Sequence, residues 1–86
     1  MGAVAITFRV MPDDPKADLE AIKSRVRASL GVAFRNLREE PVAFGLVAIV
    51  TVAVIDDSAG GSEKLEHSLS GIPGVSSVET VDVTLV

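Results

Sequence analysis

Side chains that could carry acid–base or metal chemistry are scarce in this sequence. The chain holds one His, His67, no Cys, and two pairs of adjacent aspartates, Asp13–Asp14 and Asp56–Asp57. Catalysis by His67 would need a positioned partner in a pocket, and the sequence indicates neither. The absence of Cys excludes disulfides, thiolate metal ligands and Cys nucleophiles. We therefore expect no catalytic residue and no metal ligand, and we interpret the chain as a binding protein and not an enzyme.

The acidic pairs lie at junctions between predicted strands and helices, where carboxylates commonly cap helices and form turns. A weak divalent-cation site is the alternative at both pairs. The stretch Ala59–Ser62 ("AGGS") precedes a predicted helix, and a phosphate could in principle bind at such an N-terminus. Its neighbours Asp57 and Glu63 would repel an anion, and the chain has neither a P-loop nor a G-x-G-x-x-G motif. We predict turns at these places and no bound cofactor.

The elements that position these side chains follow from hydrophobic periodicity. Residues Ala3–Val10 alternate, with every second side chain strongly apolar, which predicts a half-buried strand. Apolar residues then recur at helical spacing up to Leu30, which predicts an amphipathic helix over Pro15–Leu30. Asp14 is expected to cap its start and Gly31 to end it in a left-handed conformation.

The middle of the chain predicts two strands. Val32–Glu39 is the weaker one, because Phe34 and Leu37 are out of phase for simple alternation unless the strand contains a bulge. Residues 39–41 are expected to turn the chain. Val42–Ile55 is almost continuously apolar and predicts a long strand whose first residues overhang its neighbours.

A second helix and a last strand complete the pattern. Ser62 is expected to cap a helix that runs to about Ser70, and Gly71 and the Pro73–Gly74 pair should end it and turn the chain. Val75–Leu85 is the last predicted strand. The order β-α-β-β-α-β over residues 1–86 predicts a single α+β domain, the ferredoxin-like plait, with two helices on one face of a four-stranded antiparallel sheet.

The second face of this sheet should be open and apolar. Both faces of the third strand carry aliphatic side chains, so whichever face lies under the helices, the other would expose a hydrophobic patch. Such a patch indicates an interaction surface. A homo-oligomer that covers its own sheet, or a curled edge strand, is the alternative, and the sequence does not choose between them.

The net charge, the N-terminal segment and the longest uncharged run limit the classes of binding partner. The net charge of −4 argues against nucleic acid, for which a basic face would be expected, and against an anionic membrane surface. The start "MGAVAITFRV" lacks the features of a signal peptide, and the longest uncharged run, 41–55, is too short to span a bilayer. We expect a cytoplasmic protein that binds another protein, with no membrane and no direct nucleic-acid contact.

Two segments carry a resemblance to a known family. "EPVAFGLVAIVTVAVIDD", joined with "GGSEKLEHSLSGIPGVSSVETVDV", is similar to the archaeal translation elongation factor 1-beta family. The likeness extends over nearly the whole chain, and "PVAFGL" and "LSGIPGV" together are fairly specific. The resemblance implies the ferredoxin-like plait and guanine-nucleotide exchange on elongation factor 1-alpha, the GTPase that delivers aminoacyl-tRNA. It implies that this partner is bound in its GDP-bound and nucleotide-free states.

The resemblance also implies partner-binding residues. In the family, the ring of the P-x-x-F-G segment contacts the GTPase, which here would be Phe44, while Pro41 and Gly45 would shape the turn and allow close backbone approach. The alternative is that Phe44 is buried under the helices. Eukaryotic members end with a Lys that reaches the magnesium site of the GTPase. No Lys or Arg occurs in residues 75–86 of this chain, so we assign that role to no residue. A second hypothesis, from another class, is a regulatory plait that binds a small ligand and dimerises through its sheet.

Overall fold

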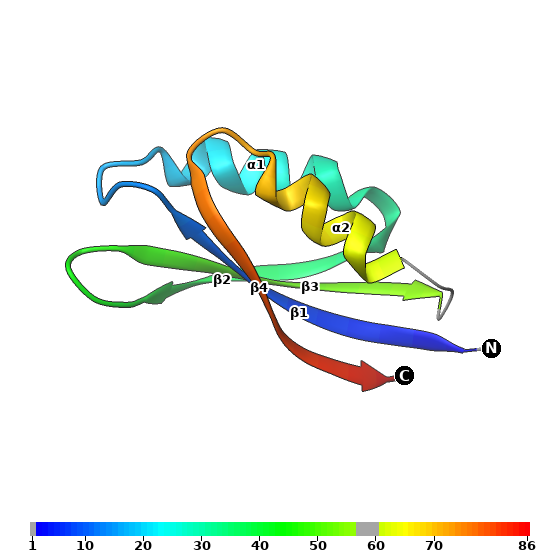
Figure 1. The fold of residues 1–86 in the computed structure, drawn as a ribbon. Helices are drawn as coiled ribbons and strands as arrows, with labels where there is room; N and C mark the ends of the chain where they lie inside the picture. Colours follow the sequence, from blue (N-terminus) through cyan, green and yellow to red (C-terminus); the bar gives the residue numbers. More distant parts are fainter. Residues whose placement is uncertain (1, 57–60) are drawn as a thin grey trace.

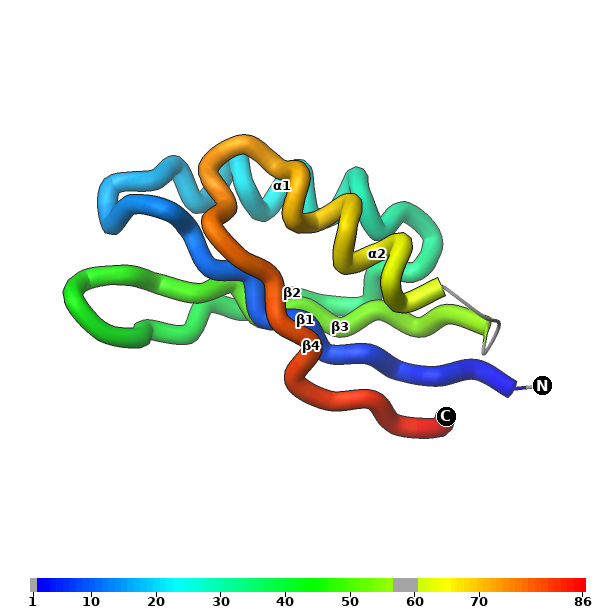
Figure 2. Tube along the Cα trace, in the orientation of Figure 1, coloured from blue at the N-terminus to red at the C-terminus, as the bar shows by residue number. Residues whose placement is uncertain are grey.

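The predicted order of strands and helices is confirmed. The computed structural model describes residues 2–56 and 61–86 (Figure 1). The elements are, in chain order, β1 (Ala3–Pro12), α1 (Leu19–Leu30), a short 3₁₀ turn (Gly31–Ala33), β2 (Phe34–Pro41), β3 (Val47–Asp56), α2 (Gly61–Ser70) and β4 (Val75–Leu85). Both helices lie on one face of the sheet, as the trace in Figure 2 shows.

The four strands form one antiparallel sheet in the order β2-β3-β1-β4. The two most apolar strands, β1 and β3, therefore occupy the centre, as the sequence predicts. This arrangement is the ferredoxin-like plait. Of the described residues, no helix is long and apolar enough to cross a membrane.

The hydrophobic core lies between the sheet and the helices. Every second residue of β1 is buried, and Phe8 is fully buried with 0% of its surface exposed. From α1, the residues at helical spacing, Ile22, Val26 and Leu30, pack into the same cluster. One of the three Phe residues, Phe8, is thus part of the core, and the question is whether Phe44 is buried in the same way.

Helix α1 begins four residues later than the sequence analysis predicts. Asp18, and not Asp14, is the residue that caps it, and its carboxylate accepts a hydrogen bond from the Ala21 amide at 3.2 Å. The Asp14 carboxylate instead accepts from the Lys16 amide at 2.7 Å, which makes a turn before the helix. Both aspartates have the chemistry of a cap, and periodicity does not decide between them. Gly31 ends the helix with a φ of 55° and a ψ of −127°, so the positive φ is confirmed but the residue does not have the ψ of a left-handed helix.

The boundaries of β2 and β3 also differ from those predicted. The register shift between Phe34 and Asn36 confirms the bulge on this edge strand. However, β2 continues to Pro41, so residues 39–41 are strand and not a turn. The chain reverses over residues 42–46, and β3 begins at Val47 and not at Val42. Residues 42–46 were predicted to be strand because they are continuously apolar. The positive φ values of Phe44 and Gly45 are incompatible with a strand.

The second half of the chain agrees more closely. Strand β4 has the predicted bounds, and Gly74 turns the chain with a φ of 91°. Ser62 lies inside α2 and does not precede it, so the prediction of Ser62 as the capping residue is wrong. The predictions for Asp57 and for Ala59–Gly60 fall outside the described residues.

The open face of the sheet is less apolar than expected. Val50 faces away from the helices, and it is the register partner of Arg9 on one side and Arg38 on the other. It is only 4% exposed, and its neighbour on the same face, Ala48, is also buried. Long Arg side chains cover apolar surface with their aliphatic stems. The predicted aliphatic patch is therefore wrong at Ala48 and Val50; Val52 and Val54 remain half-buried.

Candidate functional site

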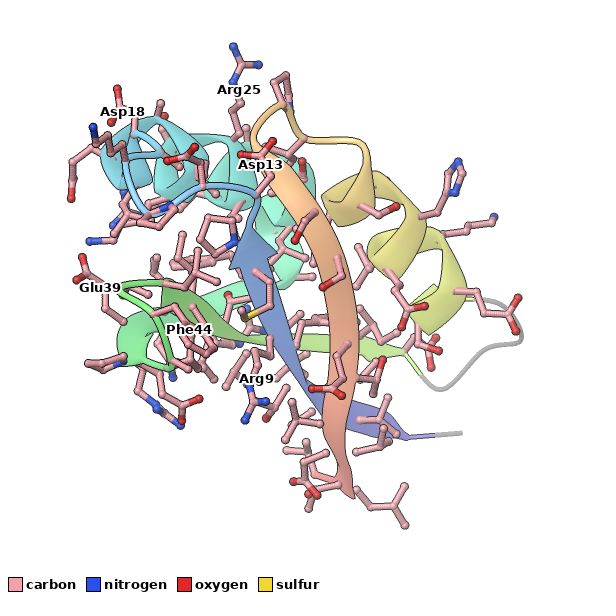
Figure 3. All side chains as sticks on the ribbon, turned by 60° about the vertical axis from the view of Figure 1, so that its left-hand side comes forward. Arg9, Asp13, Asp18, Arg25, Glu39 and Phe44 are labelled. Carbon is pink, nitrogen blue, oxygen red and sulfur yellow. The ribbon has the colours of Figure 1, made fainter. Side chains whose placement is uncertain are left out.

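The β2–β3 hairpin presents an exposed aromatic ring. Residues 41–45 are all exposed, and Phe44 has 94% of its surface accessible. In Figure 3, Phe44 lies on the hairpin loop. The alternative that Phe44 is buried under the helices is therefore wrong. An exposed ring does not stabilise a core, so the hydrophobic effect gives no reason for its place here.

The backbone at the tip makes the choice of Phe more unusual. The Leu46 amide donates to the Ala43 carbonyl at 3.1 Å, closing a four-residue turn whose central residues are Phe44 and Gly45. Both central residues have positive φ, 59° and 78°, which is the φ pattern of a type I′ turn. Asn and Gly dominate such positions, and a bulky residue in the left-handed region costs about 1–2 kcal/mol. Strain of this kind at a tip is a sign of function.

Pro41 and Gly45 frame this turn. Pro41 forms the last pair of β2, opposite Val47, where the edge strand needs no further ladder donor. Within the chain, the positive φ of Gly45 explains why a glycine stands there. Crowding does not explain it, because a Cβ at Gly45 would lie 3.7 Å from the Pro15 Cβ, which is an ordinary contact. The three residues that the resemblance singles out thus lie together at one hairpin, Pro41 at the end of β2 and Phe44 and Gly45 in the loop that follows.

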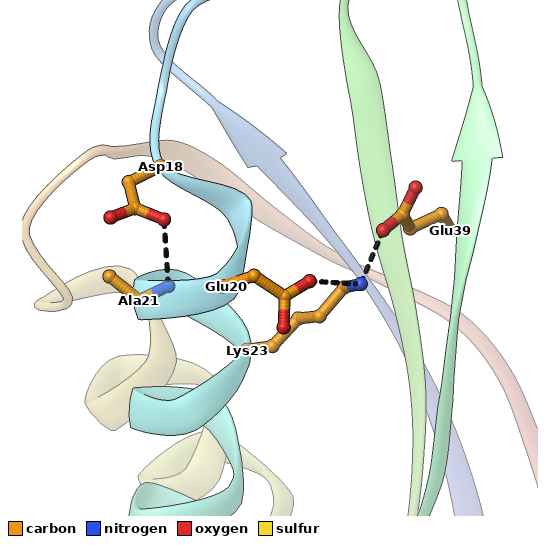
Figure 4. A network of polar contacts seen from close by, with 5 residues as sticks. All are labelled: Asp18, Glu20, Ala21, Lys23 and Glu39. Carbon is orange, nitrogen blue, oxygen red and sulfur yellow. Dashed lines mark hydrogen bonds and ion pairs between the residues drawn. The ribbon is translucent and has the colours of Figure 1, made fainter.

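The base of the hairpin carries ion pairs that the sequence analysis missed. Glu39 accepts a hydrogen bond from the Lys23 ammonium of α1, which also lies 3.0 Å from Glu20 (Figure 4). The hydrogen bond to Glu39, followed by that to Glu20, raises the pKa of Lys23 above its usual value. On the opposite face, Glu40 lies 3.3 Å from the Arg9 guanidinium of β1, which in turn is 3.4 Å from Glu79 of β4.

A signal for these pairs was present in the sequence. Two consecutive glutamates in a strand point to opposite faces, so cations that pair with them must come from different neighbouring elements. Glu39 and Glu40 were predicted to form a turn, in which strand alternation does not apply, but they lie in β2.

A second exposed apolar surface lies at the other end of the molecule. We define the β4 patch as the exposed aliphatic residues at the end of the last strand: Val81, Val83, Leu85 and Val86. In Figure 1, this end of β4 bends away from the helices and lies beside the N-terminus, far from the hairpin. The Val86 amide donates to the Ala3 carbonyl at 3.0 Å, so the strand is paired almost to its end.

The remaining sequence candidates show no assembled chemistry. His67 is exposed on α2, and its backbone carbonyl accepts hydrogen bonds from the Ser70 hydroxyl and the Gly71 amide. Asp13 and Asp14 are exposed in the turn before α1. Within residues 2–56 and 61–86, no group of three or more His, Cys, Asp or Glu side chains is placed to hold a metal ion.

Comparison with known proteins assigns the chain to a family. A sequence model described as the EF-1 guanine nucleotide exchange domain matches residues 5–86. Proteins called elongation factor 1-beta are similar over nearly their whole lengths. That of Methanothermobacter thermautotrophicus is 47% identical over 85 residues, which cover 96% of each chain. Those of Methanoculleus marisnigri and Methanocaldococcus jannaschii are 45% and 41% identical, over 100% and 99% of both chains. The chain therefore belongs to the EF-1 guanine nucleotide exchange domain family.

Proposed function

We propose that this chain promotes GDP release and GTP loading on elongation factor 1-alpha by binding the nucleotide-free GTPase preferentially, with Phe44 as the anchor of the contact. Guanine-nucleotide exchange is the function of the family to which the chain belongs. The reaction changes no covalent bond. No catalytic residue or cofactor of the exchange factor is required, and residues 1–86 act as one exchange domain.

The physical basis is thermodynamic linkage. A protein that binds the empty GTPase more tightly than the GDP-bound form must weaken GDP binding by the same factor. Each tenfold preference therefore corresponds to about 1.4 kcal/mol of coupling free energy. Kinetically, the factor opens a route on which GDP dissociates from the ternary complex, after which GTP enters the vacated site.

The observation that carries the proposal is the exposure of Phe44 on a strained turn. A ring that is 94% exposed in the free chain can bury most of its surface in a partner's pocket. Its left-handed backbone is already set, so binding does not have to order it. Aromatic anchors of this kind contribute about 2 kcal/mol or more on truncation. Pro41 and Gly45 support the contact by fixing the loop and by leaving its backbone accessible.

The test is the release rate of a fluorescent GDP analogue from elongation factor 1-alpha, measured with increasing concentrations of this chain. We expect a saturating acceleration, and we expect Phe44→Ala to raise the half-saturating concentration about thirtyfold. The unfolding midpoint of Phe44→Ala should stay close to that of the unmodified chain. Val32→Ala is the matched control, because Val32 is about as exposed as Phe44 but lies outside the hairpin, in the 3₁₀ turn. Equal activity of Phe44→Ala and Val32→Ala would refute the anchor.

The competing function, a regulatory plait that forms a homo-oligomer through its open sheet face, is less well supported. Ala48 and Val50 on that face are already buried within one chain. A dimer would also have to cover the charged Arg9 and Glu40 beside them. Failure to accelerate release at micromolar concentrations would favour this competitor.

A further inference from the structure

The base of the hairpin is the part of β2 with the least apolar packing. Phe34 and Leu37 pack against the core, but from Arg38 to Gly45 every residue is exposed except the half-buried Glu40. Apolar contacts therefore end well before Phe44. Ile49, the partner of Glu39, still pairs with Val10 of β1, but beyond it β2 and β3 pair only with each other. Such a two-stranded ribbon twists readily and is only marginally stable by itself. Something other than apolar packing must fix the direction of the hairpin.

Charged contacts hold this base from both faces of the sheet. The register partner of Glu39 is Ile49, which lies in the core under the helices, so Glu39 faces α1. The partner of Glu40 is Ala48 on the opposite face. Glu39 binds Lys23 of the helix layer, and Glu40 lies 3.3 Å from Arg9 of the central strand β1. Figure 3 shows Glu39 on the helix side of the hairpin and Arg9 on the other face.

We propose that Lys23 and Arg9 are positioning residues for exchange: by holding Glu39 and Glu40 from opposite faces of β2, they fix the direction in which the hairpin presents Phe44. This inference rests on the proposed function. We call these two contacts, Lys23–Glu39 and Arg9–Glu40, the hairpin-base ion pairs.

The burial of these groups supports a fixed geometry. The Lys23 side chain is only 15% exposed, although Lys normally keeps its ammonium in water. Lys is charged at neutral pH even at its ordinary pKa, and the hydrogen bonds to Glu39 and Glu20 raise the pKa of Lys23 further. On the other face, Arg9 Nε and Glu40 Oε1 are buried and have no hydrogen-bond partner among the described residues, so the 3.3 Å ion pair is the contact that joins these two side chains. Ion pairs near the surface contribute little to global stability, so the expected effect lies in orientation and in the ordering cost of binding.

The chain offers a matched control for each contact. Lys23 also lies 3.0 Å from Glu20, and Arg9 also lies 3.4 Å from Glu79, but neither of these carboxylates belongs to the hairpin. Glu39→Gln with Glu40→Gln therefore removes one carboxylate from Lys23 and one from Arg9, and with Glu40 also the 4.0 Å contact to Arg38 of the same strand. Glu20→Gln with Glu79→Gln removes one carboxylate from each of the same cations elsewhere. The two double variants change net charge equally and preserve side-chain size.

The experiment measures the half-saturating concentration and the maximal rate of GDP-analogue release for both double variants. We expect the hairpin-base variant to raise the half-saturating concentration about fivefold, and the control variant to change it less than about twofold. Unfolding midpoints in urea should be similar. In a Phe44→Ala background the hairpin-base variant should have almost no further effect, because no ring remains to be positioned. A merely structural role would not give this non-additivity.

A charge-exchanged pair provides an independent arm. Lys23→Glu alone should impair exchange, and adding Glu39→Lys should restore most of it, because the contact is rebuilt with reversed polarity. Equal effects of the hairpin-base and control variants, full additivity with Phe44→Ala, or no rescue would each overturn the positioning role. Failure of the proposed function is distinguishable, since the unmodified chain would then not accelerate release at all.

Discussion

Two phenylalanines occupy opposite environments in this molecule. Phe8 lies at the centre of β1, fully buried in the core, with an extended backbone that any strand residue adopts. Phe44 lies at the tip of the β2–β3 hairpin, almost fully exposed, with a φ of 59°. The first follows from the hydrophobic effect. The second is disfavoured both by its exposure and by its backbone.

The difference separates a residue that stabilises the fold from one that we propose binds a partner. The β4 patch makes the distinction sharper, because Val81, Val83 and Leu85 are also exposed but do not have the positive φ of Phe44. Scattered exposed aliphatic residues are common on protein surfaces. Exposure therefore says little by itself, whereas exposure combined with a conformation that the residue type disfavours indicates a function.

The largest effect should come from truncating the buried ring. Phe8→Ala removes a fully enclosed side chain from the centre of the sheet, and we expect a loss of about 3–5 kcal/mol in the free energy of unfolding. For a domain of this size, that is a large share of the total stability. Phe44→Ala should change the same quantity by less than about 0.5 kcal/mol.

Urea unfolding followed by circular dichroism measures both variants under one set of conditions. The slope of the transition tests whether the denatured states are comparable. A similar loss of stability for the two variants would break the comparison, because it would mean that Phe44 also stabilises the fold.

The sequence was sufficient for the parts of the molecule that apolar periodicity controls. The alternation in β1, the spacing of Ile22 and Val26 in α1 and the boundaries of β4 were predicted, because burial on one face leaves a regular pattern. The bulge in β2 was predicted from the phase of Phe34 and Leu37. Pro41, Phe44 and Gly45 were proposed as a site from resemblance, and no pattern in the residues alone required it.

The features that were not predicted are those for which the sequence allows two local structures or for which a neighbouring strand decides. Asp14 and Asp18 compete for the start of α1, and only the geometry of the turn decides. The stretch from Val42 to Leu46 is apolar enough to be strand, yet it forms the loop because Phe44 and Gly45 adopt positive φ. The burial of Val50 depends on its two register partners, Arg9 and Arg38, and an alternation argument for one strand does not include its neighbours.

A smaller effect, of opposite sign for folding and function, should follow from Phe44→Asn. Asn tolerates the left-handed region far better than Phe and is the usual residue at this position of a type I′ turn. We therefore expect a gain of about 0.5–1 kcal/mol in the free energy of unfolding. Exchange activity should fall about as far as in Phe44→Ala, because the ring is lost.

Val32→Asn is the matched control for that variant. It replaces another exposed apolar residue with Asn, and of the described non-glycine residues only Phe44 has positive φ, so no strain is relieved at Val32. Unfolding in urea and release of the GDP analogue give the two quantities. Unchanged or lowered stability of Phe44→Asn would show that the left-handed backbone is not strained by the ring.

The smallest expected effect is a dependence of stability on pH. It distinguishes the hairpin base, which charged contacts stabilise, from the uncharged core around β1. Lys23 has its pKa raised above 10.5 by Glu39 and then Glu20, so the folded chain holds this proton more tightly than the unfolded chain. A raised pKa stabilises the fold fully below the unfolded value, and the contribution is lost as pH rises through the folded value. The stability difference between the unmodified chain and Lys23→Met should therefore be constant from about pH 7 to pH 9 and shrink above about pH 10.5.

Ile6→Val, a change in the uncharged core, is the control. Its stability difference from the unmodified chain should not vary over this pH range. Equal pH dependence of the two differences, measured by urea unfolding, would mean that the Lys23 contacts do not stabilise the hairpin base through charge.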